Sequence, residues 1–172
     1  PMEEYSMKPT EDIKNQIDAI RIIHEKLYQT GNIAEICCRD YFDDLLHSIF
    51  SSFSTRPVKI EADIDEIPIP TKSAMSLGLI VNEIATNAIK HGFNETEEAV
   101  FSVDMKEDRE NDRYELTLSN TGNPFPEDIE VDNPQTLGLR LISVLTTQLD
   151  GTLELKREPY PVFTIRVPIE EE

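Results

Sequence analysis

One short segment combines a carboxylate, an amide, a cation and an imidazole at helical spacing. Within the run 82–91, polar side chains recur at steps of three or four residues, as Glu83, Asn87, Lys90 and His91. Such spacing puts them on one stripe of a helix and the apolar residues on the other side. A carboxylate can act as a general base, an amide oxygen can ligate Mg²⁺, and Lys with His can neutralise phosphate. The stripe predicts a nucleotide triphosphate site; the alternative is a solvated helix surface ending in a dipole-stabilised Lys-His pair.

Two later segments have features of a ligand site. A strand pattern ends in Asn120-Thr121-Gly122, which brings a polar side chain and bare backbone to a sheet edge, although Asn and Gly also form plain turns. Near 136–141 a helix begins with Gly138 between Leu137 and Leu139. Free N–H groups at a helix N-terminus bind anions and glycine lets phosphate approach, although a helix cap can merely tolerate glycine.

Composition restricts the classes of partner. The 172 residues are 38% hydrophobic, enough for a core, and carry a formal net charge of -18. This charge repels phosphate, so we expect no binding to nucleic acid or to an anionic membrane surface. A nucleotide then needs a divalent cation and a locally positive pocket. The sequence has neither a membrane-spanning stretch nor a signal-peptide core, and we expect a cytoplasmic protein.

The first third of the chain has helical periodicity. Apolar residues at 13, 17, 20, 23 and 27 follow alternating steps of four and three, which predicts a helix over 12–27 that packs on another helix and ends near Gly31-Asn32. A second helix is predicted over 38–53. The connector 51–57 is the predicted boundary between a helical segment, 1–53, and a second domain, 54–172.

After this connector the apolar period changes to two. Strands are predicted over 58–64, 99–105, 114–118, 152–156 and 162–167, with an extended break at 67–71. Helices are predicted over 71–91 and 136–149. This order is too irregular for a doubly wound parallel fold. It predicts an α+β fold in which a mixed sheet carries its helices on one face, preceded by the helical segment.

Together and in this order, the motifs resemble the ATP-binding (GHKL or Bergerat-fold) domain of histidine kinases, gyrase B, Hsp90 and MutL. The resemblance is to a sensor histidine kinase subgroup and runs from about Ile13 to Val167. The segments that carry it are His24-Glu25-Lys26-Leu27-Tyr28, Leu77-Gly78-Leu79-Ile80-Val81-Asn82-Glu83 through His91, Asn120-Thr121-Gly122, Leu137-Gly138-Leu139 and Gln148-Leu149-Asp150-Gly151. The central helix motif is specific, and the glycine motifs support it.

The resemblance implies a role for each candidate residue. Glu83 would be the general base and Asn87 would hold Mg²⁺ against the triphosphate. Lys90 and His91 would meet phosphates. Asn120 and Gly122 would face adenine, and the backbone of 137–139 would cradle the phosphates. The cofactors are then ATP and Mg²⁺, and alignment with electrostatic stabilisation lowers the barrier to γ-phosphoryl transfer.

Three features depart from the family pattern. Asn120 stands where the family usually has Asp, which weakens the acceptor for the adenine amine and leaves the base preference open. Tyr160-Pro161 replaces the usual Gly-Thr of the last strand. The family's phosphoacceptor helix is not recognisable, so we expect the acceptor histidine on a segment missing from this chain. His24 is the weaker candidate for that acceptor.

The sequence thus predicts the catalytic region of a two-component sensor histidine kinase. Its partners would be ATP, the phosphoacceptor helix of its own full-length protein, a response regulator and possibly a second copy in a homodimer. We expect no autophosphorylation of the isolated chain. The alternative is a degenerate nucleotide-sensing or interaction module without kinase activity. A water-activating ATPase of the gyrase or MutL kind is a third hypothesis, disfavoured by the absence of the basic surfaces that those enzymes need.

Overall fold

A computed structural model describes residues 2–28 and 34–170, without the side chains of 2–12 and 15. Its main sheet has five strands in the order β2-β4-β5-β7-β6. Their bounds are Lys59–Ile64 for β2, Val100–Asp108 for β4, Arg113–Asn120 for β5, Thr152–Lys156 for β6 and Val162–Pro168 for β7. The β2–β4 pair is parallel and the remaining pairs are antiparallel.

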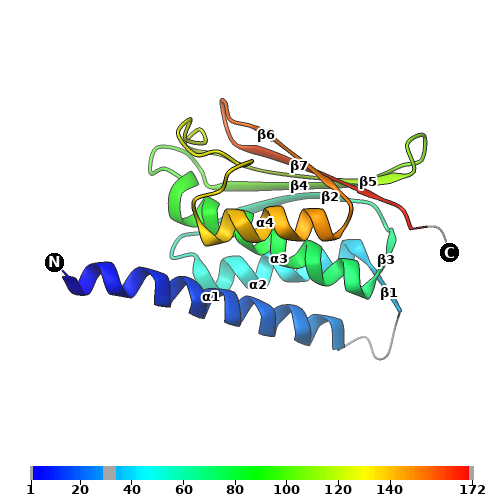
Figure 1. Cartoon of the computed structure of the whole chain (residues 1–172), viewed down its shortest axis with the longest axis horizontal. Coiled ribbons are helices and arrows are strands. Elements are labelled where there is room, and N and C mark those ends of the chain that lie inside the picture. The colour runs from blue at the N-terminus through cyan, green and yellow to red at the C-terminus, as the bar shows by residue number, and fades with distance from the viewer. Residues whose placement is uncertain (1, 29–33, 171–172) are drawn as a thin grey trace.

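The helices all lie on one face of this sheet (Figure 1). α2 (Cys38–Phe53), α3 (Thr71–Asn87) and α4 (Leu137–Gln148) form the layer next to the sheet, and α1 (Met2–Tyr28) lies outside α2 and α3. Apolar side chains alternate along each central strand, for example Phe101, Val103 and Met105 of β4, and are fully buried beneath the helices. The predicted α+β fold, with a mixed sheet and helices on one face, is confirmed.

Most predicted elements match observed ones within a few residues, since their apolar periods are regular. The strands of the β4–β5 hairpin are longer than predicted, because polar residues at 106–108 and 113 still pair in register. The segment read as an extended break contains β3 (Pro68–Pro70), which pairs with β1 (Glu35–Cys37) in a small separate sheet. A strand of three residues is too short to show the alternation of apolar and polar residues by which strands are predicted. The predicted helix end at Gly31-Asn32 lies outside the described residues.

α3 ends in a wider turn instead of running as an α-helix to His91. Ala88–Gly92 forms one π-helical turn, η1. Its cap, Phe93, donates its backbone N–H to the carbonyl oxygen of Ala88 at 2.9 Å. Such π turns are rare and often occur at functional sites. The extra residue in the turn rotates Lys90 and His91 relative to a regular helix.

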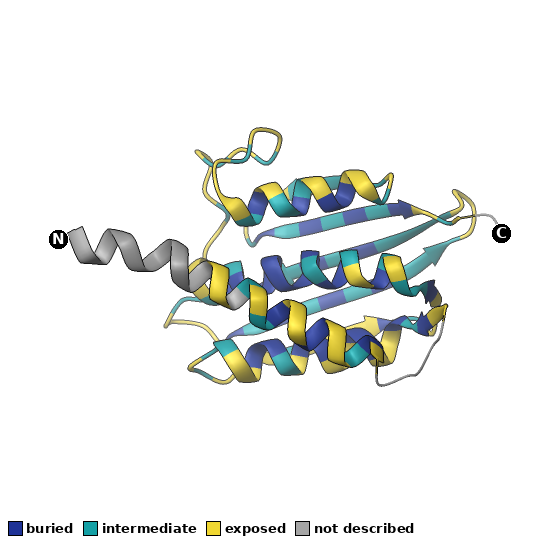
Figure 2. Cartoon of the chain, turned by 60° about the horizontal axis from the view of Figure 1, so that its bottom comes forward, coloured by how far each residue is buried: buried dark blue, intermediate teal, exposed yellow. Residues whose placement is uncertain are grey.

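The predicted packing seam of α1 divides between two faces of the helix. Ile23 and Leu27 are buried against the other helices, together with Ala19. Ile13, Ile17 and Ile20, in contrast, are about half exposed (49%, 60% and 51%), and Figure 2 shows this outer face of α1 at the surface. At 100° per residue the predicted stripe is about 120° wide, and the neighbouring helices cover only its edge at Ile23 and Leu27, beside Ala19.

One continuous hydrophobic core joins the helical segment to the sheet. It extends from Ile22 and Ile23 of α1 through α2 and α3 to Phe163 and Ile165 of β7. The division into 1–53 and 54–172 stays a prediction, and buried side chains touch across it. Among the described residues, no helix has the length and apolarity that crossing a membrane requires.

Candidate functional site

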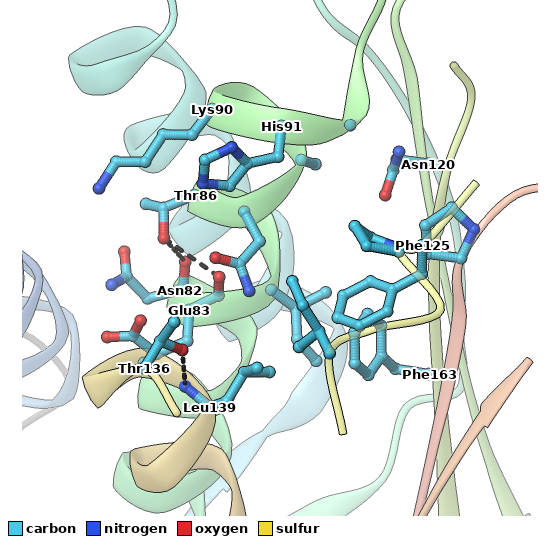
Figure 3. A pocket seen from close by; sticks show the side chains of 18 of the residues that line it. Asn82, Glu83, Thr86, Lys90, His91, Asn120, Phe125, Thr136, Leu139 and Phe163 are labelled. Carbon is cyan, nitrogen blue, oxygen red and sulfur yellow. Dashed lines mark hydrogen bonds between the residues drawn. The ribbon is translucent and has the colours of Figure 1, made fainter. Parts of the chain in front are cut away.

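A cavity of about 960 Å³ lies between α3, the start of α4, the C-terminal end of β5 and the N-terminal end of β7 (Figure 3). Volumes near this size accommodate nucleotide-sized ligands. Of the residues predicted from the sequence, those that line it are Glu83, Asn87, Lys90, His91, Asn120, Leu137, Gly138 and Leu139. Three separate parts of the sequence thus meet at one cavity.

The polar stripe of α3 and η1 forms one wall of the cavity. Glu83 is buried, with 6% of its surface exposed, Asn87 is half-buried, and Lys90 and His91 are exposed at the rim. Thr86, on the same helix, donates its hydroxyl to the carbonyl oxygens of Asn82 and Glu83 at 2.9 and 3.1 Å. The wall therefore changes from a buried carboxylate to exposed cationic side chains within two turns.

Glu83 lies where three helices meet. Its Oε1 accepts a hydrogen bond of 2.9 Å from the side-chain amide of Gln16, on α1. On the other side, a Cβ atom placed on Gly138 would lie 2.6 Å from Oε2. Glycine therefore permits the first turn of α4 to approach the carboxylate. The positive end of the α4 dipole favours a negative group there, whether a carboxylate or a phosphate.

The first turn of α4 has a defined cap. Thr136 accepts a hydrogen bond of 3.3 Å from the backbone N–H of Leu139 through its hydroxyl oxygen. The predicted helix start at Thr136 thus corresponds to the cap residue, and α4 begins at Leu137. N–H groups of a first helical turn have no partner within the helix, and those of Leu137 and Gly138 adjoin the cavity.

Asn120 ends β5 on the cavity side of the sheet. Its side-chain N–H donates to the carbonyl oxygen of Thr121 at 2.9 Å. A carbonyl oxygen only accepts, so this contact fixes the nitrogen outward and the Oδ1 toward the cavity, as Figure 3 shows. Gly92 provides the space for this amide, because a Cβ atom there would lie 2.4 Å from the Asn120 nitrogen.

Gly122 does not line the cavity, contrary to the expectation that it faces a base. It has a positive φ of 113°, and a Cβ atom on it would lie 2.2 Å from the carbonyl oxygen of Gly92. The next residue, Asn123, donates its backbone N–H to that same oxygen at 2.7 Å. Gly122 therefore holds the loop after β5 against the π turn, and Asn123 lines the cavity beside it.

The opposite wall is apolar and was not predicted. Phe125 and Phe163 pack edge to face, with ring centroids 5.7 Å apart. Pro161, noted in the sequence only as a departure, lines the same wall together with Ile129. Loop residues such as Phe125 and Ile129 show no period from which a role can be inferred. Gln16 was missed for a different reason: its contact with Glu83 spans 67 positions of sequence.

Arg157 supports this apolar wall from behind. Its guanidinium donates to the carbonyl oxygens of Pro126 and, at 2.8 Å, Ile129, and lies 5.4 Å from the centre of the Phe125 ring. Phe125 also donates its backbone N–H to the Arg157 carbonyl oxygen at 3.0 Å. Each partner of Arg157 lines the cavity. The residue after β6 thus fixes the shape of the loop.

The donor set suits a magnesium ion that arrives with phosphate. Within the described part of the chain, no group of three or more His, Cys, Asp or Glu side chains is placed to hold a metal ion. The cavity instead offers amide oxygens, from Asn87 and from Asn82, whose buried Oδ1 has no hydrogen-bond partner among the described residues. Mg²⁺ commonly takes one or two protein ligands and completes its shell with waters and substrate phosphates.

Comparisons with known proteins agree with this geometry. Residues 72–171 match the family described as histidine kinase-, DNA gyrase B- and HSP90-like ATPase, and residues 2–53 match a histidine kinase family. The chain is 27% identical over 100 residues to blue-light-activated histidine kinase 2 of Erythrobacter litoralis, covering 58% of this chain and 29% of that protein. It is 24% identical over 159 residues to sensor histidine kinase PdtaS of Mycobacterium tuberculosis, covering 90% of this chain and 31% of the relative. The chain spans about a third of the length of these relatives.

Solved structures share the fold. The histidine kinase domain of the Erythrobacter litoralis EL346 blue-light-activated kinase superposes with a TM-score of 0.79 at 22% identity, over 91% of this chain and 74% of that one. Histidine kinase AdeS of Acinetobacter baumannii gives 0.61 at 13% identity, over 98% and 84% of the two chains. The ATPase family match covers more than half of the chain, and a histidine kinase match precedes it. The chain therefore belongs to the histidine kinase-, DNA gyrase B- and HSP90-like ATPase family.

Proposed function

We propose that this chain catalyses transfer of the γ-phosphoryl group of ATP to a histidine, as the kinase part of a two-component sensor. One observation carries the proposal: a buried carboxylate, amide oxygens, a lysine, a histidine and the N-terminus of a helix all line one cavity of about 960 Å³. A triphosphate needs such a combination of positive potential, metal-compatible oxygens and a base. The apolar wall opposite provides a surface for a purine ring.

Glu83 is the proposed general base. In the transfer step, an imidazole nitrogen attacks the γ-phosphorus, an N–P bond forms, and the bond to the β–γ bridging oxygen breaks to release ADP. Glu83 takes up the imidazole N–H proton as the nitrogen becomes positive. The position of the carboxylate at the α1 side of the cavity supports this role, because an acceptor helix can approach there without entering the purine pocket.

The phosphates would lie between α3 and α4. Lys90 and His91 approach them from the rim, and the N–H groups of Leu137 and Gly138 from the start of α4, where Leu139 lines the cavity with its own N–H bonded to Thr136. Asn87 is the proposed protein ligand to Mg²⁺. When bound, Mg²⁺ neutralises triphosphate charge and aligns the γ-phosphoryl group for in-line attack.

Asn120 would read the base. Its nitrogen is engaged by Thr121, so the oxygen that faces the cavity is a hydrogen-bond acceptor. An acceptor at this position suits the amine of adenine and opposes O6 of guanine. The hydrogen bond to Thr121 therefore favours ATP, which the sequence alone left open.

The acceptor histidine is proposed to come from outside the described residues. His24 is exposed on α1 and stacks on Tyr28, with ring centroids 4.1 Å apart. Gln16, which contacts Glu83 from α1, lies eight residues before His24. His24 is therefore about 12 Å further along the helix than this contact with the proposed base. A response regulator would take the phosphoryl group in turn. Dimer formation and a cytoplasmic location are parts of the same proposal.

Labelling with Mg–[γ-³²P]ATP tests this function. The chain is incubated with and without a separately expressed acceptor segment of its full-length protein, and acid-labile, base-stable label is counted. We expect label on the added segment only, dependent on Mg²⁺ and strongly reduced, to a low residual rate, by Glu83→Gln. Label on the isolated chain that is lost in His24→Ala would instead make His24 the acceptor.

A non-catalytic nucleotide sensor is the second candidate, favoured by one observation. Both Asn120 and Pro161, which replace the usual residues of the family, line the purine end of the cavity. Tight binding of Mg–ATP without transfer to any acceptor, and with no change in Glu83→Gln, would support this candidate over the kinase.

A further inference from the structure

A described side chain of the outer helix α1 contacts the candidate base. Gln16 lines the cavity and donates its amide N–H to Oε1 of Glu83 at 2.9 Å. α1 lies outside the residues that match the ATPase family, 72–171. A donor from a different segment therefore contacts the carboxylate on which the proposed proton transfer depends.

The place of Gln16 is determined by packing further along the same helix face. Ala19 and Ile23 follow at steps of three and four residues and are buried. Gly78 of α3 leaves room for Tyr41 of α2, since a Cβ atom on Gly78 would lie 2.2 Å from the Tyr41 hydroxyl oxygen, and it would lie at an ordinary contact distance of 3.4 Å from Ile23 Cδ1. Tyr41 in turn donates its hydroxyl to the carbonyl oxygen of Ala74 at 2.9 Å. Packing of α1 on α2 and α3 thus holds Gln16 in position.

An amide side chain can orient the general base through a hydrogen bond without placing a positive charge next to it. Gln16 has no charge, and its hydrogen bond orients one oxygen of Glu83. The second oxygen, Oε2, lies beside Gly138 of α4. Contacts from α1 and α4 therefore define the plane of the carboxylate from two sides.

From these contacts we infer that Gln16 is a positioning residue, through which the placement of α1 sets the orientation of Glu83 for phosphoryl transfer. The inference rests on the proposed kinase function and adds a route by which the helical segment acts on the site. A displacement of α1 breaks this 2.9 Å hydrogen bond to the carboxylate, whereas Asn120 and the apolar wall belong to β5, β7 and the loops beside them.

The test compares variants at position 16 that differ in donor capacity. Gln16→Met keeps the length of the side chain and removes the donor, and Gln16→Lys restores an N–H donor. Lys14→Gln, at an exposed position on the same helix, is the control. We measure kcat and the KM for Mg–ATP in transfer to the supplied acceptor segment, in the presence and absence of Glu83→Gln.

We expect Gln16→Met to lower kcat about tenfold with the KM for Mg–ATP unchanged, as for loss of a hydrogen bond to a charged group. Gln16→Lys, which restores a donor but adds a positive charge beside Glu83, is expected to recover little of this loss, and Lys14→Gln to match the unsubstituted chain. On the Glu83→Gln background, Gln16→Met is expected to cause no further loss, since both act through one carboxylate.

Each other outcome contradicts a specific statement. Equal kcat for Gln16→Met and the unsubstituted chain, or additive losses with Glu83→Gln, would overturn the inference and leave the kinase function in place. A parallel rise in KM would show that Gln16 acts in nucleotide binding instead. Absence of transfer from the unsubstituted chain that still binds Mg–ATP would overturn the proposed function itself.

Discussion

Gly138 lies directly against Glu83, since a Cβ atom on the glycine would be 2.6 Å from Oε2 of the carboxylate. Gly138→Ala therefore pushes the flexible end of Glu83 away and leaves the backbone in place. A displacement of about 1 Å can cost two orders of magnitude in rate, so we expect phosphoryl transfer to fall by about 100-fold. Stability should change by less than about 1 kcal/mol, because Ala favours the helix.

Transfer rates and urea unfolding of Gly138→Ala check this prediction together. Val144→Ala, at an exposed position of the same helix, is the control. An active Gly138→Ala variant would mean that Glu83 tolerates displacement and is not the base. A variant that loses both activity and fold would make Gly138 a packing residue.

A second prediction concerns the choice of base. The Asn120 nitrogen is held by the Thr121 carbonyl oxygen, so an acceptor faces the cavity. We expect Mg–ATP to bind about tenfold more tightly than Mg–GTP. The adenine amine can donate to the Asn120 oxygen, whereas O6 of guanine would face that oxygen as a second acceptor. Asn120→Leu, which keeps the branched shape without polar atoms, should reduce this ratio to about one mainly by weakening ATP binding. Calorimetric titration with both nucleotides gives the ratio, and equal affinities for the unsubstituted chain would contradict the assignment.

The third prediction separates structure from ligand contact at Gly122. Its φ of 113° and its approach to the Gly92 carbonyl oxygen exclude a Cβ atom, yet it does not line the cavity. Gly122→Ala should therefore destabilise the fold by about 1–3 kcal/mol, the usual range for such a conformation. Thermal unfolding measures the loss, with Glu127→Ala in the following exposed loop as control. Unchanged stability with weakened nucleotide binding would instead support the original placement at the base.

The elements of this fold could be predicted because their information is local. The period of two in β4 and the period of 3.6 in α3 each follow from ten or so neighbouring residues. The stripe from Glu83 to His91 was predictable for the same reason, and its residues do line one cavity. The π turn at Ala88–Gly92 could not be predicted, because its residues are equally typical of the end of an α-helix.

Contacts between distant segments could not be predicted. Nothing near Gln16 indicates that its amide meets Glu83, and a glutamine on a helix is ordinarily a surface residue. Gly122 illustrates the same problem, because an Asn-x-Gly turn has one sequence whether the glycine touches a ligand or the carbonyl oxygen of Gly92. The exposed face of Ile13, Ile17 and Ile20 likewise depends on which side of α1 the other helices occupy.

The fourth prediction concerns Arg157, which touches no predicted site residue. It holds the loop that forms the apolar wall through the carbonyl oxygens of Pro126 and Ile129 and through the ring of Phe125. Arg157→Ala removes these contacts, and we expect the affinity for Mg–ATP to fall about tenfold, since charged donors in partly exposed positions contribute on the order of 1–2 kcal/mol. Arg157→Lys should recover little, because a single ammonium cannot reproduce the two-pronged guanidinium contact. Lys156→Ala, next to it and exposed, should bind as the unsubstituted chain does. If Arg157→Ala binds Mg–ATP normally, the loop keeps its shape without the guanidinium, and ring packing with Phe163 and the backbone hydrogen bond of Phe125 suffice to hold the wall.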